Sequence, residues 1–208
     1  MNAVAYEFES ILRYAGFWVV HEERQLFTTD DKDKQNRPDS SINNPQSLNL
    51  STNKTFHKVL VDYSITCPLK GSVSGLIEEP SSRDNAMKVG DMADMRYKQK
   101  FSHYEKLIND LNREHPVPIN YYIQPIVFQT SGLMEKHGLG FLEKVADAAE
   151  EVKRISSCYL FTYFKRRLSC CLVKNMCASI NSRGHSIMGH LNFDFDRSFD
   201  ARFIMEQF

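Results

Sequence analysis

The amino-acid sequence predicts a single α/β domain with four strands. Two observations support this fold class. Apolar residues recur at helical spacing in several long stretches, and short apolar runs rich in β-branched and aromatic residues lie between them. The chain has 208 residues, 42% of them hydrophobic, which suffices for one substantial core. Chain length therefore favours one domain.

The first two predicted elements lie at the N-terminal end of the sequence. Residues 3–15 place apolar side chains at helical spacing, and Gly16 is a suitable stop for this helix. Residues 17–27 are aromatic and β-branched and alternate loosely, which favours a strand. The charged and polar run over residues 28–36 predicts a solvated hairpin loop.

The next two predicted strands carry the most informative residues. Residues 37–42 read as a strand, and the polar residues 43–55 predict a loop. Residues 57–66 form the strongest strand signal in the chain, and their nearly continuous apolar middle favours a central position in the sheet. Pro68 ends this strand because it lacks the backbone N–H that a sheet needs.

Helices dominate the second half of the sequence. Apolar residues at helical spacing predict a long helix over residues 83–111, which Pro116 and Pro118 terminate. Residues 121–130 predict the fourth strand, and residues 133–181 predict two further helices. We therefore expect a four-stranded sheet flanked by helices, with additional helices toward the C-terminus.

The last 18 residues differ in character from the rest. Over residues 191–208, phenylalanines alternate with acidic side chains. We assign residues 1–190 to one domain and residues 191–208 to an aromatic and acidic tail, which is either a docking peptide or a disordered end.

Two aspartates point to a metal-dependent chemistry. Asp39 and Asp62 each lie beside an apolar, β-branched run, so the two carboxylates can face one another across neighbouring strands. Carboxylate oxygens on rigid strands suit Mg²⁺ or Mn²⁺, and water and substrate phosphate complete the coordination of these ions. The alternative is structural: Asp39 is only a turn residue after proline, and Asp62 only forms a salt bridge at a strand end.

The sequence around these aspartates resembles known nucleases. Pro38-Asp39 and Asp62-Tyr63-Ser64 resemble the PD-(D/E)XK nuclease motifs, with serine where lysine is expected. The chain is more similar to the endonuclease-like segment downstream of reverse transcriptase in some eukaryotic retroelements. That similarity is carried by Arg37-Pro38-Asp39, Val61 to Pro68, Tyr97 to Phe101, and Pro125 to Gly132.

The resemblance implies a fold, a function and a set of site residues. The implied fold is a restriction-endonuclease-like αβββαβ core with a mixed four-stranded sheet and added C-terminal helices. The implied activity is metal-dependent hydrolysis of DNA, by a domain fused to or derived from a reverse transcriptase polyprotein. Asp39 and Asp62 are then the ligands of Mg²⁺ or Mn²⁺, with Glu9 on the first helix as a further ligand.

The lysine missing at Ser64 needs a replacement in this interpretation. We expect Lys98 on the long helix to stabilise the charge of the phosphate in the transition state, with Lys100 as the alternative. Both lysines could equally be solvated residues on the helix surface, and Glu9 could be an ordinary surface charge. Gln99, between the two lysines, is a weaker candidate for binding phosphate.

Overall charge restricts the alternatives. The 26 basic residues balance 26 acidic ones, which argues against a protein that coats DNA but leaves room for a local basic rim. A second hypothesis is therefore a catalytically inactive nuclease fold that binds nucleic acid or protein. A third, a structural protein without a ligand, requires the two aspartates to point apart.

Cysteine usage and hydropathy address the cellular environment. Five cysteines form an odd set without a Cys-x-x-Cys pair, which favours a reducing compartment. A zinc site from the C-terminal cysteines and histidines is not expected, because their spacing lacks the tight pairs of zinc ligands. With neither a signal-like segment nor an apolar run of membrane-spanning length, we expect an intracellular protein, nuclear or cytoplasmic.

Overall fold

The structure is a computed structural model, and it describes residues 3–21, 38–48, 50, 56–66, 91–114, 120–130 and 132–187. Residues 1–173 form one compact unit, and residues 174–208 form a second. The tail predicted over residues 191–208 lies outside the described residues, as do the predicted hairpin loop and residues 83–90 of the long helix.

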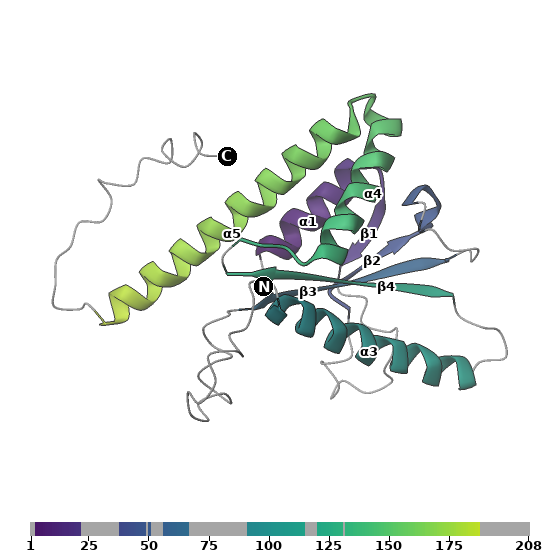
Figure 1. Ribbon diagram of the computed structural model, residues 1–208, viewed down its shortest axis with the longest axis horizontal. Coiled ribbons are helices and arrows are strands. Elements are labelled where there is room, and N and C mark those ends of the chain that lie inside the picture. The colour runs from purple at the N-terminus through teal and green to yellow at the C-terminus, as the bar shows by residue number, and fades with distance from the viewer. Residues whose placement is uncertain are drawn as a thin grey trace. The chain divides into compact units, whose positions relative to one another are not determined.

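The described elements follow the predicted order of a helix, three strands, a helix, a strand and two helices (Figure 1). They are α1 (Ala3–Tyr14), β1 (Trp18–His21), β2 (Ser40–Asn43), the 3-10 helix η2 (Pro45–Leu48), β3 (Lys58–Thr66), α3 (Asp91–Glu114), β4 (Tyr121–Gln129), α4 (Lys136–Lys153) and α5 (Ser157–Ile187). The predicted α/β class is therefore confirmed.

The four strands form one mixed sheet in the order β1-β2-β3-β4. β1 pairs with β2 and β2 with β3 in antiparallel fashion, whereas β3 and β4 are parallel. The interior position predicted for residues 57–66 is confirmed. β4 is an edge strand, and Pro125 is its central residue, a position that proline tolerates only at a sheet edge or a bulge.

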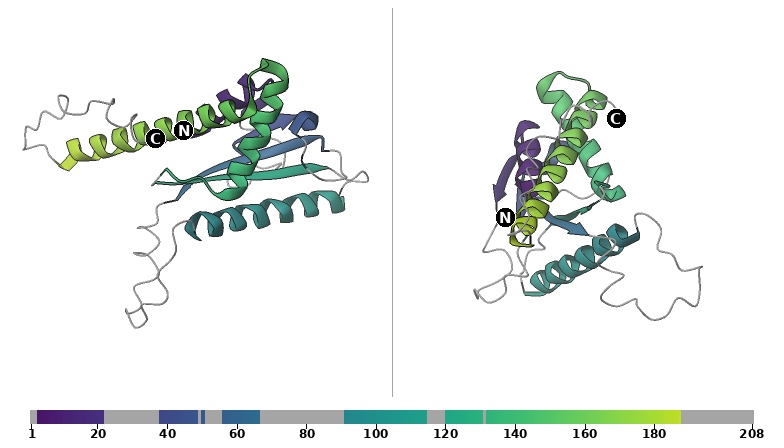
Figure 2. Two further views of the ribbon diagram at one scale, coloured as in Figure 1. Left: turned by 45° about the horizontal axis from the view of Figure 1, so that its top comes forward. Right: turned by 90° about the vertical axis from the view of Figure 1, so that its left-hand side faces the viewer.

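Helices cover both faces of the sheet within the first unit. α3 lies along one face, and α1 and α4 lie on the other (Figure 2). On the α1 face, Phe8 packs against Tyr63 of β3 and Phe141 of α4, with ring centroids 5.6 Å and 6.4 Å away. On the α3 face, a separate buried cluster is built from Leu60, Tyr104, Ile108 and Ile123.

α1 shows how the predicted periodicity produces this packing. Val4, Phe8, Ile11 and Leu12 recur at helical spacing and are all fully buried. Gly16 then ends the helix with φ +95°, a left-handed conformation that glycine adopts without strain, and its N–H donates to the Arg13 carbonyl at 3.0 Å. The predicted stop at Gly16 is confirmed.

The two C-terminal helices are separated by a short break. Arg154 adopts a left-handed conformation with φ 58° and ψ 34°, and its N–H donates to the Glu150 carbonyl. α5 begins three residues later and extends beyond the predicted end at Asn181. None of the helices in the described part of the chain is both long and apolar enough to cross a membrane.

Candidate functional site

The register between β2 and β3 brings the two predicted aspartates together. The last pair of this antiparallel ladder is Ser40 opposite Val61, so the next position sets Asp39 opposite Asp62. Side chains directly opposite one another on antiparallel strands have Cβ atoms only about 5 Å apart. Asp39 Oδ2 also accepts a 2.7 Å hydrogen bond from the backbone N–H of Tyr63, which holds its carboxylate against β3.

Asp62 lies at the centre of this arrangement. Its side chain is 9% exposed and forms a salt bridge with Lys100 of α3, whose own side chain is 16% exposed. Asp39 and Tyr104 also come within hydrogen-bonding reach of the Asp62 carboxyl. Asp39, Asp62, Lys100 and Tyr104, which we call the aspartate cluster, thus join the end of the β2–β3 ladder to α3.

Electrostatics in the aspartate cluster penalise the second negative charge. Burial raises the pKa of Asp62 from 3.8 to about 6, Lys100 opposes this rise, and the neighbouring Asp39 adds to it. The single ammonium group therefore does not fully compensate for the burial of the Asp62 carboxylate beside Asp39. At neutral pH the cluster has a formal charge of −1, which a bound cation would neutralise.

Tyr104 completes the surroundings of Asp62. Burial and the nearby Asp62 and Asp39 charges all raise the pKa of Tyr104, so it stays protonated at neutral pH and can donate to the carboxylate. Tyr104 also belongs to the apolar cluster beneath α3. The tyrosine therefore links the site to the core. No motif in the sequence distinguishes it from an ordinary packing residue.

The structure brings Lys100, and not Lys98, to Asp62. The Lys98 side chain is 73% exposed, and its Nζ lies 3.9 Å from Asp94 on the same helix. Residues two apart on a helix are rotated by about 200°, so only one of these lysines can face the sheet. The expected approach of Lys98 to Asp62 is therefore wrong, and the alternative residue Lys100 occupies that place.

Glu9 is buried, but the structure does not bring it into contact with Asp39 or Asp62. It lies on α1, across the sheet from α3, and its Oε1 is 2.6 Å from His21 Nδ1. Its Oε2 accepts a 3.2 Å hydrogen bond from Arg13. Because the carboxylate is engaged by these two groups, the ligand role predicted for Glu9 has no support from the geometry.

Ser64 lies two positions after Asp62 on β3, on the same face of the sheet. It accepts a 3.3 Å hydrogen bond from Nε of Arg96, one turn before Lys100 on α3. Arg96 also donates a 3.4 Å bond to Gln99. Sequence analysis did not single out Arg96, because a lone arginine on a polar helix has no distinguishing pattern.

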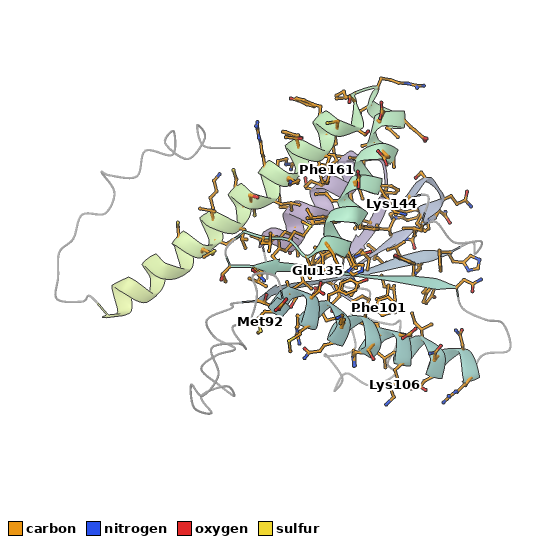
Figure 3. The ribbon with its side chains drawn as sticks, in the orientation of Figure 1. Met92, Phe101, Lys106, Glu135, Lys144 and Phe161 are labelled. Carbon is orange, nitrogen blue, oxygen red and sulfur yellow. The ribbon has the colours of Figure 1, made fainter. Side chains whose placement is uncertain are left out.

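A second group of polar side chains, not predicted from the sequence, connects α3 to α4. Asp94, Glu135 and His137 each place a potential ligand atom within 4.8 Å of the others. Glu135 lies at the start of α4 (Figure 3). Its carboxylate caps the helix by accepting bonds from the N–H groups of His137 and Gly138 at 2.9 Å and 3.2 Å.

The charges in this second group are matched by neighbouring residues. Glu135 Oε1 lies 2.6 Å from His137 Nδ1, and the His137 ring stacks on Tyr97. Asp94 has Lys136 at 3.5 Å and Lys98 at 3.9 Å. Helix capping and these ion pairs account for the group as a structural connection, without a metal.

Several basic residues of the two C-terminal helices have partners within the domain. Arg167 donates to Glu7 at 2.5 Å and to Ser10 at 3.2 Å. Lys153 lies 4.6 Å from the Tyr14 ring centroid and Lys165 5.3 Å from that of Phe161. The Arg167 and Lys153 contacts attach α5 and α4 to α1, whereas the Lys165 contact lies within α5, so these three side chains already have partners within the domain.

Comparisons of the chain with models of protein families, with curated proteins and with solved structures found no match.

Proposed function

We propose that this chain is a metal-dependent endonuclease domain that hydrolyses DNA phosphodiesters. The observation that carries the proposal is the aspartate cluster, in which two carboxylates from neighbouring strands meet beside one lysine. Two neighbouring carboxylates with one lysine between them and the helix leave a net negative centre, and carboxylate oxygens of this kind hold Mg²⁺ at phosphate sites. The order of the elements supports the αβββαβ core expected from the nuclease resemblance.

Asp39 and Asp62 have the chemistry to hold Mg²⁺ or Mn²⁺. Both offer hard oxygen donors on rigid backbone, and the raised pKa of Asp62 reflects a charge that lacks sufficient compensation. When bound, the ion would lower the pKa of a coordinated water and neutralise charge on the phosphate. The Tyr63 N–H holds the Asp39 carboxylate against β3, and Tyr104 can donate to Asp62.

The nuclease motif has a lysine where this chain has Ser64. In this proposal Lys100 takes over the role of that lysine. Its ammonium group reaches the same carboxylate from α3 instead of from β3. From there it can stabilise negative charge that develops on the phosphate during attack by water. A donor that is already positioned needs little reorganisation in the transition state.

A second candidate is a nuclease fold that binds nucleic acid without cleaving it. Two observations favour it: serine occupies the expected lysine position, and the chain has no excess of positive charge. In this case Lys100 simply neutralises one buried carboxylate. The two candidates differ in whether the protein binds divalent metal ions and cleaves DNA with them.

Incubation of the purified protein with supercoiled DNA tests the proposal directly. Nicking that requires Mg²⁺ or Mn²⁺ and disappears with a chelator is the expected result. The metal should also raise the melting temperature of the protein, because a ligand that binds only the folded state stabilises it. DNA binding without nicking and without metal stabilisation would establish the second candidate instead.

A further inference from the structure

α3 and β3 are in register on the face that carries the aspartate cluster. Leu60 packs with Tyr104, Asp62 pairs with Lys100, and Ser64 bonds to Arg96. Each step of two residues along β3 thus matches four residues back along α3. The match is geometric, because four helical residues rise about 6 Å and two strand residues about 6.6 Å.

Polarity increases along this series toward the end of β3. Leu60 is buried in the apolar cluster, Asp62 is nearly buried and ion-paired, and Ser64 is partly exposed. Arg96, which faces Ser64, is exposed. The guanidinium therefore lies in solvent, about 6 Å of helix axis beyond Lys100 and on the same side of α3.

Arg96 differs in charge pairing from the other cations of this region. Lys100 pairs with Asp62, and both Lys98 and Lys136 pair with Asp94. Within the described part of the chain, Arg96 has only uncharged partners, the Ser64 hydroxyl and the Gln99 amide oxygen. A guanidinium carries five N–H donors, so most of its donors and its whole charge remain available.

We propose that Arg96 binds a phosphate of the DNA backbone next to the aspartate cluster, held in place by Ser64 and Gln99. This inference rests on the proposed nuclease function and names the group that positions its substrate. Planar guanidinium groups bind phosphate oxygens through two parallel hydrogen bonds. Ser64 is then the hydroxyl that orients the phosphate-binding arginine, in addition to occupying the position of a missing lysine.

A purely structural role for Arg96 predicts a different behaviour. Its two hydrogen bonds are 3.3 Å and 3.4 Å long and lie at the surface, so their loss costs little stability. Substitution should then leave DNA affinity unchanged. A phosphate contact, in contrast, contributes to affinity for every DNA sequence and to its dependence on salt.

The test measures DNA binding by fluorescence anisotropy over a range of salt concentrations, in the presence of a chelator. Arg96→Ala is expected to weaken binding roughly tenfold. It should also reduce the slope of log affinity against log salt by about 0.9, because one phosphate contact is lost. Lys98→Ala is the matched control, since Lys98 is an exposed cation on the same helix that pairs with Asp94.

Two further variants separate charge from geometry. Arg96→Lys should keep the salt slope but bind more weakly than wild type, because lysine cannot form the two parallel bonds. Ser64→Ala should weaken binding by a smaller factor without changing the slope, since the charge of Arg96 remains. Thermal melting of each variant checks that the fold is retained.

The possible outcomes distinguish this inference from the nuclease proposal. If Arg96→Ala matches wild type in affinity and slope, Arg96 does not bind phosphate, even where the wild type cleaves DNA. If the slope changes but the wild type never nicks DNA with Mg²⁺ or Mn²⁺, Arg96 is a phosphate contact of a binding module and the nuclease proposal fails. A wild type without affinity for DNA overturns both.

Discussion

The two faces of the sheet each contain a buried carboxylate, but they balance its charge differently. On the α1 face, Glu9 is fully buried and has two basic partners, Arg13 and His21. On the α3 face, Lys100 pairs with Asp62, which also has the Asp39 carboxylate as a neighbour. Glu9 thus has its charge matched by its neighbours, whereas the aspartate cluster itself keeps an excess of negative charge.

The comparison shows that burial of an acid does not by itself identify a site for a cation. Glu9 is more deeply buried than Asp62, yet its carboxylate oxygens are satisfied within the protein. The distinguishing property of the α3 face is an uncompensated charge held in a fixed geometry. The four expectations below test that difference.

Removing either aspartate should have the largest effect. Asp39→Asn and Asp62→Asn keep the shape of the side chain but remove a charged ligand, so metal-dependent nicking should fall by more than about 100-fold. Metal stabilisation measured by thermal melting should be lost in parallel. Retention of both properties in the two variants would exclude the aspartate cluster as the metal site.

Replacing each of the two lysines with alanine should show which face of α3 contributes to cleavage. Lys100→Ala is expected to slow nicking by about 100-fold, because a donor to the transition state is removed. Lys98→Ala should change the rate by less than about twofold, because surface charges contribute little at this distance. A rate assay at saturating metal compares the two, and equal rates would contradict the assignment of Lys100.

Disrupting the α1 face should affect stability and leave metal binding intact. Glu9→Ala leaves Arg13 and His21 without their carboxylate, so we expect the free energy of unfolding to fall by about 2 kcal/mol. Urea denaturation at pH 7 measures this loss. The metal-induced increase in melting temperature should persist, and its disappearance would place Glu9 among the metal ligands after all.

Acidification should produce the smallest of the four effects. The pKa of Asp62 is raised to about 6, so at pH 5 most molecules carry it protonated and unable to bind a cation well. At sub-saturating Mg²⁺, the nicking rate should therefore fall about tenfold between pH 7 and pH 5. A rate that stays flat over this interval would show that Asp62 titrates elsewhere.

The same shift has an opposite consequence for folding. Because the folded state binds the Asp62 proton more tightly than the unfolded state, its contribution to stability is present below about pH 4 and is lost as pH rises through about 6. The free energy of unfolding of wild type, relative to Asp62→Asn, should decline over this interval. Denaturation curves at several pH values measure the difference.

Sequence patterns predicted the fold class because each main element carries its own signal. The apolar run of β3 indicates an interior strand, and the helical spacing of α1 indicates its buried face. The two aspartates could be located because each lies beside such a run. Their convergence depends on the register of β2 against β3, and a shift by one residue would have separated them.

The rotation of α3 about its own axis explains why Lys98 was expected at Asp62 in place of Lys100. Its lysines occur on a mostly polar helix, where the apolar spacing is too weak to decide which of Lys98 and Lys100 faces the sheet. For Glu9, the inward position on α1 was foreseeable, but the side of the sheet that α1 covers was not. Both errors arise because tertiary packing, which local patterns do not encode, sets the orientation of each helix.

Pro125 at the middle of β4 has a consequence for association between molecules. β4 is a nine-residue strand at the edge of the sheet, and such an edge can recruit a strand from another chain. Proline in a sheet is tolerated where its missing N–H would face away from the ladder, which leaves a gap in the outward row of donors. A strand added along β4 would therefore lose a hydrogen bond at its centre, which opposes growth of the sheet into aggregates.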